Sequence, residues 1–147
     1  MKKQPTRAHV PLGNPVPSPQ PNDLFLSVSP VPSAAGLART FVEHRLNALG
    51  MADLVDDALV VVSELVTNAA REHREHRPTV PITVRLALTD EGRPRIEVTD
   101  RSPNMPRLRN ASPVEESGRG LLLVTAIARE AGYKPVPGCG KTVWAVL

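Results

Sequence analysis

The pattern of hydrophobic and polar positions predicts five strands between residue 24 and the end of the chain. Apolar and polar side chains alternate over 24–28, 82–88 and 95–100, which is the period of a β-strand. A short turn containing glycine separates the second and third of these stretches, so they are predicted to form a β-hairpin. Two closing strands are predicted near 133–136 and 141–147.

Hydrophobic positions follow a helical period in the segments between these strands. A first helix is predicted from the capping residue Ser33 to about residue 49, and a second helix over 52–72 carries a continuous apolar stripe. A third helix is predicted over 120–131, after a long polar loop at 101–117 that holds three prolines. This order of elements indicates an α/β (α+β) two-layer sandwich, in which helices cover one face of a mixed, mostly antiparallel sheet.

The first 22 residues differ in composition from the rest of the chain. They contain six prolines and three basic residues but no acidic residue, which predicts an extended tail (1–22) before one folded domain (23–147). The tail is either an unstructured extension or a docking peptide for a proline-reading module. Taking its three basic residues from the total of 18 leaves 15 basic residues against 15 acidic ones. Since the domain is neutral and poor in aromatic residues, direct nucleic-acid binding is not expected.

Cysteine content and hydropathy indicate the cellular compartment. The single cysteine, Cys139, cannot form an intrachain disulfide, which fits a reducing cytoplasm. No apolar run approaches the roughly 20 residues of a membrane helix, and no apolar stretch follows the N-terminal lysines as it would in a signal peptide. We therefore predict a cytoplasmic protein that does not bind a membrane.

Glu64 and Asn68 are the candidate chemical groups of the second helix. They are four residues apart, so they lie on one face of the helix, opposite its apolar stripe. Because Val60 and Val61 share that side, we expect it to be covered rather than solvated. A carboxylate can act as a general base, and an amide oxygen is a suitable ligand for Mg²⁺.

Two further candidate sites flank the long loop. Asp100 ends a predicted strand, where it can either contact a ligand or form an ordinary turn with Ser102. The Gly118-Arg119-Gly120 segment precedes the third helix, where free backbone N–H groups can bind phosphate. Paired glycines at this point could equally form a hinge.

Other patterns in the chain do not form the sites that they superficially suggest. The Gly140-Lys141-Thr142 triplet is not a P-loop, since it runs into a predicted strand and not into a helix. His73 and His76 do not have metalloprotease spacing, so we expect a solvated helix end there. Cys139 has no neighbouring base in the sequence and is not expected to act as a nucleophile.

The order of the motifs is more specific than any one of them. They follow one another along the chain as Glu64-Leu65-Val66-Thr67-Asn68-Ala69, Asp100-Arg101-Ser102-Pro103, Gly118-Arg119-Gly120-Leu121 and Gly140-Lys141-Thr142-Val143-Trp144. Over residues 24–147 this order resembles the GHKL-type ATP-binding regulators, which are related to histidine kinase catalytic domains and to anti-sigma factors. The resemblance implies the Bergerat (GHKL) ATP-binding fold, with ATP and Mg²⁺ as cofactors.

The resemblance also implies a role for each matching position. Glu64 would be the general base, Asn68 would hold Mg²⁺, and Asp100 would accept a hydrogen bond from the adenine amino group. Gly118 and Gly120 would direct backbone N–H groups to the phosphates. The resemblance further implies a mobile ATP lid at 101–117, a water-mediated adenine contact from Thr142, and nucleotide-binding positions at Ser102, Arg119 and Leu121.

By resemblance, the expected activity is that of a serine/threonine protein kinase that phosphorylates a STAS-type anti-anti-sigma protein and sequesters a sigma factor. A homodimer is compatible with this expectation. Two departures favour an alternative, a docking module without catalysis: Glu72 stands where relatives have a histidine, and Ser102-Pro103 replaces a glycine-rich box. A third hypothesis, a detached histidine kinase catalytic domain, lacks a phospho-accepting histidine on a dimerising helix.

Overall fold

The computed structural model describes residues 20–21, 23–76, 79–103, 119–138 and 140–147. The predicted tail at 1–22 and the predicted lid at 101–117 therefore lie largely outside the described residues. The elements, in chain order, are β1 (Leu24–Val28), α1 (Ala34–Ala48), the 3-10 helix η1 (Ala52–Leu54), α2 (Val55–His76), β2 (Ile82–Leu88), β3 (Pro94–Asp100), α3 (Arg119–Ile127), β4 (Glu130–Pro135) and β5 (Lys141–Val146).

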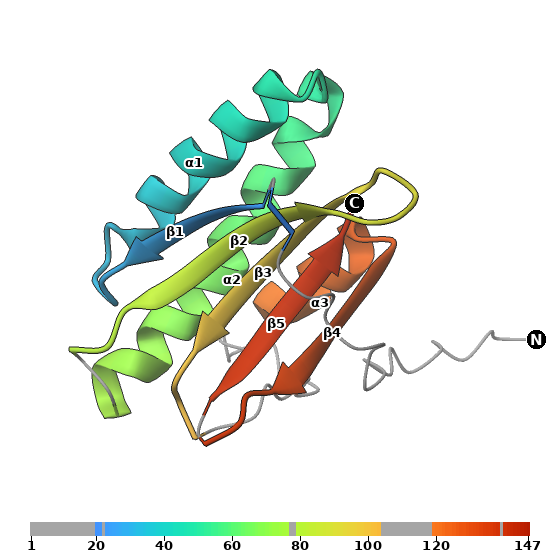
Figure 1. The fold of residues 1–147 in the computed structure, drawn as a ribbon. Helices are drawn as coiled ribbons and strands as arrows, with labels where there is room; N and C mark the ends of the chain where they lie inside the picture. The colour runs from blue at the N-terminus through green and yellow to red at the C-terminus, as the bar shows by residue number, and fades with distance from the viewer. Residues whose placement is uncertain (1–19, 22, 77–78, 104–118, 139) are drawn as a thin grey trace, which may run out of the picture.

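The five strands form one sheet, and the helices lie together on one of its faces (Figure 1). The strand order is β1-β2-β3-β5-β4, and each of the four pairings is antiparallel. The α+β two-layer architecture predicted from the sequence is thus confirmed, with an antiparallel sheet throughout the described strands. The position of β5 beside β3 brings the end of β3 next to the start of β5.

The core lies between the sheet and the helices, and α2 is its central helix. The buried face of α2 includes Val62 and Val66, while β3 contributes Ile96 and Val98 from the sheet. All four side chains are at most 1% exposed. Fully burying one such aliphatic side chain stabilises the fold by about 1.5–3 kcal/mol, so this aliphatic layer fixes α2 on the sheet.

Element boundaries differ from the prediction mainly where tertiary pairing competes with helix propensity. The third helix ends at Ile127 and not at 131, because the backbone N–H of Arg129 donates to the carbonyl of Val146 and the chain enters β4. Ser33 occupies the N-cap of α1 as predicted, but its side chain makes no capping hydrogen bond.

Candidate functional site

Three polar side chains line one side of α2 at intervals of four residues. Glu64, Asn68 and Glu72 lie on successive turns, so they follow one stripe of the helix. All three are half-buried. The expectation of a covered face holds for Val61, which is fully buried, whereas Val60 is 37% exposed.

Asp100 sits at the end of β3, and its carboxylate is held by the first residue of β5. The two strands pair so that Asp100 lies opposite Lys141. Lys141 Nζ is 3.0 Å from Asp100 Oδ2 and 3.2 Å from Oδ1, and the backbone N–H of Ser102 donates to Oδ1 at 3.0 Å. Asp100 is 1% exposed and Lys141 3%, so this is a buried ion pair.

Lys141 also connects the strand ends to the polar stripe of α2. Its Nζ donates to Glu72 Oε2 at 3.0 Å, while the Glu72 side chain remains 30% exposed. Glu72 therefore faces the end of β3. Asn68 and Glu64 lie on the same stripe about 6 Å and 12 Å back along the helix axis, at 1.5 Å per residue.

Burial and charge act in opposite directions on the Asp100 carboxyl. Burial, the largest cause, raises its pKa above 3.8, and the Coulombic attraction of Lys141 and the hydrogen bonds from Lys141 and Ser102 lower it in part. The net result is a raised pKa, to which the nearby Glu72 also contributes. A carboxyl with this property is a candidate functional group, because perturbed pKa values cluster at such sites.

Gly140 allows the two strands to approach each other at this point. Its φ is +111°, and a Cβ added there would lie only 2.1 Å from the carbonyl oxygen of Asp100. The glycine is thus required by close backbone approach as well as by its dihedral angle. As expected, the triplet that begins with Gly140 continues into a strand.

His73 belongs to the structural support of this site, a role that the sequence reasoning missed. The side chain is fully buried, so the expectation of a solvated helix end is wrong for this residue. Its Nε2 accepts from the backbone N–H of Arg101 at 2.6 Å, and its Nδ1 lies 3.0 Å from the carbonyl oxygen of Val80. The ring must therefore carry its proton on Nδ1, which donates to Val80. Through Nε2 the ring holds the backbone of Arg101, the residue that follows Asp100.

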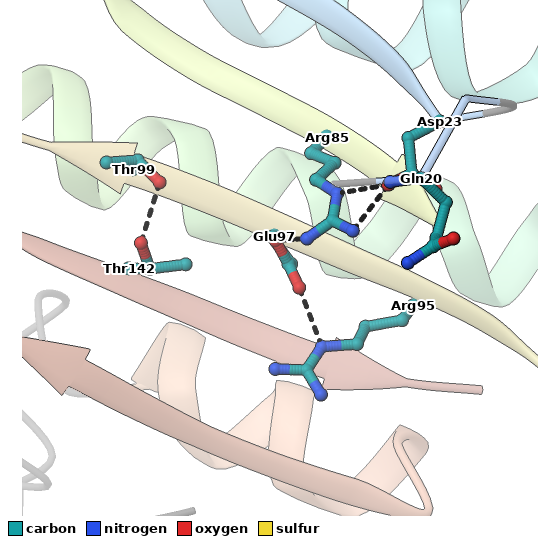
Figure 2. A network of polar contacts seen from close by, with 7 residues as sticks. All are labelled: Gln20, Asp23, Arg85, Arg95, Glu97, Thr99 and Thr142. Carbon is teal, nitrogen blue, oxygen red and sulfur yellow. Dashed lines mark hydrogen bonds and ion pairs between the residues drawn. The ribbon is translucent and has the colours of Figure 1, made fainter. Parts of the chain in front are cut away.

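Thr142, predicted to support adenine, is not brought together with Asp100. Successive side chains of a strand point to opposite faces, so Thr142 lies on the face that carries no helix. There its Oγ1 is 2.7 Å from Thr99 Oγ1 (Figure 2). The side chain of β5 that does reach Asp100 is Lys141.

The phosphate-binding candidates are described only in part. Gly118 lies outside the described residues, and Arg119 and Gly120 form the first turn of α3. Leu121 is half-buried and packs against the core. Cys139 also lies outside the described residues.

The described polar groups fit a nucleotide and Mg²⁺ incompletely. An ionised carboxylate offers about four lone-pair sites, and Lys141 and Ser102 already use several of those on Asp100. The side-chain amide of Asn68 carries an oxygen of the type that Mg²⁺ prefers. Among the residues described, no three His, Cys, Asp or Glu side chains are grouped closely enough to hold a metal ion. None of the described helices is both long enough and apolar enough to span a membrane.

Two solved structures with the same fold align with most of this chain. The crystal structure of the RsbU and RsbW domains of Rv1364c from Mycobacterium tuberculosis matches with a TM-score of 0.63 and 25% identity, over 88% of this chain but only 32% of that one. The SiaB–SiaC complex from Pseudomonas aeruginosa matches with a TM-score of 0.64 and 15% identity, over 84% of this chain and 88% of that one, and shows the fold alone.

Comparison of sequences defines the family. A search of curated proteins finds no match. The family model of the histidine kinase-like ATPase domain, by contrast, matches residues 28–147, which include β2 to β5 and the three α-helices of the described part of the chain. The chain therefore belongs to the histidine kinase-like ATPase domain family.

Proposed function

We propose that the protein is a Mg²⁺-ATP-binding regulator of the anti-sigma type with serine/threonine protein kinase activity. The observation that supports this proposal best is the alignment of Glu64, Asn68 and Glu72 along one stripe of α2, with the last of them directed at the end of β3. On this proposal the stripe would offer a base and a metal ligand on the side of the helix that meets Lys141, the ion-pair partner of Asp100. In phosphoryl transfer the protein mainly positions groups and stabilises charge, so few side chains are required.

Each residue has a defined part in this proposal. Asn68 would hold Mg²⁺, which neutralises phosphate charge when bound, and Asp100 would orient the adenine through its amino group. Glu64 would remove the proton from a serine or threonine hydroxyl of the partner. That oxygen then bonds to the γ-phosphorus as the bond to the ADP oxygen breaks, which yields a phosphoprotein and ADP. The proposed substrate is a STAS-type protein, and the proposed client is a sigma factor.

Phosphate transfer to a protein tests the catalytic part of this proposal. The purified chain would be incubated with Mg²⁺-ATP and STAS-domain proteins from its own organism, and the products analysed by mass spectrometry. We expect a phosphoserine or phosphothreonine that is lost with Glu64→Ala and retained with Glu43→Ala, which changes an exposed carboxylate on α1. Transfer that persists in Glu64→Ala would exclude Glu64 as the base.

A docking module without catalysis is the second candidate, and one observation favours it. Lys141 already holds the acceptor oxygens of Asp100, and Glu72 adds negative charge to the same stripe. If no phosphoprotein forms while ATP still alters partner binding, and Glu64→Ala leaves that effect intact, this candidate is the correct one.

A further inference from the structure

The sheet face without helices carries side chains that are buried nonetheless. The described α-helices pack on the opposite face (Figure 1). On the helix-free face, however, Trp144 is 4% exposed, Arg95 7% and Glu97 3%. In a two-layer fold this face should be open to solvent, so something beyond the two described layers contributes to its burial.

These side chains form a continuous row across the strands. Arg85 on β2 lies opposite Glu97 on β3, which in turn lies opposite Trp144 on β5, and next to Trp144 is Gly132 on β4. Arg85 Nη1 donates to Glu97 Oε2 at 2.9 Å (Figure 2). The Arg95 guanidinium stacks over the Trp144 ring at 4.2 Å from its centroid. The row therefore ends at the stacked side chains of Trp144 and Arg95, which lie beside Gly132 and are called the aromatic platform below.

Two donors of this platform lack a hydrogen-bond partner among the described residues. Trp144 Nε1 and Arg95 Nη2 are both buried from solvent and unpaired there. Arg95 Nε forms an ion pair with Glu97 Oε1 at 2.8 Å, but in an orientation that does not make a hydrogen bond. A buried donor without an acceptor is costly, so a covering segment should provide carbonyl oxygens.

The N-terminal segment enters the described structure at one end of the same row. Arg85 Nε donates to Asp23 Oδ2 at 3.0 Å, and the backbone N–H of Gln20 donates to the same oxygen at 2.6 Å (Figure 2). The Asp23 carboxylate thus accepts hydrogen bonds from both Gln20 and Arg85, which places residue 20 beside Arg85. The chain preceding Gln20 starts two strand spacings away from Trp144, which is about 10 Å at 4.8 Å per spacing.

We propose that residues 15–19 (Pro15-Val16-Pro17-Ser18-Pro19) bind across this row as a polyproline II segment. That conformation advances about 3.1 Å per residue, so three to four residues bridge the distance from Gln20 to Trp144. Its backbone carbonyls are not engaged in internal hydrogen bonds, and they would accept from Trp144 Nε1 and Arg95 Nη2. Proline-rich segments bind aromatic surfaces at low entropic cost. The helix-free face is therefore the proline-reading surface, and its ligand is the chain's own tail.

Relaxation enhancement from a nitroxide label tests this contact in the full-length chain. Trp144 is the only tryptophan, so one indole N–H signal reports on the platform. A nitroxide on Ser18→Cys, in a Cys139→Ser background, should broaden that signal strongly. The same label on Thr6→Cys, twelve residues further along the tail, should broaden it much less.

A substitution in the tail provides the second readout. Pro15→Ser, Pro17→Ser and Pro19→Ser combined should shift the Trp144 emission to longer wavelength and increase its quenching by acrylamide. The matched control, Pro5→Ser with Pro11→Ser, should leave both unchanged. Since these residues lie outside the domain, the fold should be preserved.

A mixture of spin-labelled and isotope-labelled chains shows whether the tail of a second copy covers the helix-free face instead. If broadening arises only between a spin-labelled chain and an isotope-labelled one, a second copy covers the face and the proposal is overturned. If neither label broadens the signal, and the triple substitution leaves the emission unchanged, the tail does not bind there and the face is left for a separate partner.

Discussion

The ammonium group of Lys141 contacts both carboxylate oxygens of Asp100, at 3.0 Å and 3.2 Å, at the point where β3 and β5 meet. In the proposed function, Asp100 would be the acceptor for the adenine amino group. A nucleotide that uses this acceptor must therefore compete with a lysine that is itself buried. We therefore expect Lys141 to limit access to Asp100 in the proposed nucleotide site.

Replacing Lys141 should separate its structural role from its effect on nucleotide binding. Lys141→Thr removes one partner of a buried ion pair, so we expect a loss of about 3 kcal/mol in the free energy of unfolding. Because the carboxylate is then released, we also expect ATP to bind about tenfold more tightly, measured by calorimetry at pH 8, where ionisation of Asp100 is favoured.

The opposite change in affinity would be equally informative. If Lys141→Thr binds ATP more weakly than the wild type while the domain is still folded, Lys141 itself contacts the nucleotide. Lys134→Thr provides the control, since it removes an exposed lysine of β4 and should change neither quantity.

The raised pKa of Asp100 predicts the sign of a pH effect on stability. The folded state binds the proton of Asp100 more tightly than the unfolded state does, because burial disfavours the charged carboxylate. The resulting stabilisation is fully present below pH 3.8, the unfolded value, and is lost as the pH rises through the higher folded value. The variant Asp100→Asn has no titratable carboxyl at this position, so its stability lacks this pH dependence. The unfolding free energy of the wild type minus that of Asp100→Asn should therefore fall with rising pH in this window.

Denaturant titrations at a series of pH values, followed by the fluorescence of Trp144, would measure this difference. A difference that rises with pH would mean that attraction to Lys141 outweighs burial and that the folded pKa is lowered. Asp90→Asn, in the exposed turn between β2 and β3, serves as the control.

Gly140 should tolerate no side chain. Gly140→Ala places a Cβ 2.1 Å from the Asp100 carbonyl oxygen and forces a φ of +111° on an L-residue. We expect a loss of roughly 3 kcal/mol or more, from backbone strain together with displacement of β3 from β5. Gly92→Ala also has a positive φ but meets nothing within 4 Å, so thermal unfolding should show a smaller loss there. Equal losses of stability at Gly140 and Gly92 would show that backbone strain, and not the clash with Asp100, causes the effect.

The sequence was sufficient to predict the elements because their hydrophobic patterns are local. Alternation over 24–28 and helical periodicity in the second helix both correspond to the observed elements. The contacts of the candidate site are not local. Glu72, Asp100 and Lys141 span almost seventy residues. The β3–β5 register places Asp100 opposite Lys141, and the packing of α2 on the sheet brings Glu72 to the same lysine.

Two side chains illustrate what sequence reasoning could not resolve. Motif resemblance implies a water-mediated adenine contact from Thr142, but it does not indicate that Lys141 is the residue of β5 that reaches Asp100, because neighbouring side chains of a strand point to opposite faces. The spacing of His73 and His76 fits no metal site, so the sequence predicts a solvated helix end at His73. Its burial depends on the return of Val80 and Arg101 to the end of α2, which no local pattern records.

The central claim, a working Mg²⁺-dependent nucleotide site, is tested most directly by titrating ATP into the protein by calorimetry with and without Mg²⁺. Wild type, Lys141→Thr and Asn68→Ala would be compared, each with its fold verified by circular dichroism. We predict that ATP binds, that Mg²⁺ tightens binding, and that Asn68→Ala removes the effect of Mg²⁺. Absence of binding at millimolar ATP in both wild type and Lys141→Thr would contradict the claim, and the catalytic role of Glu64 would be withdrawn.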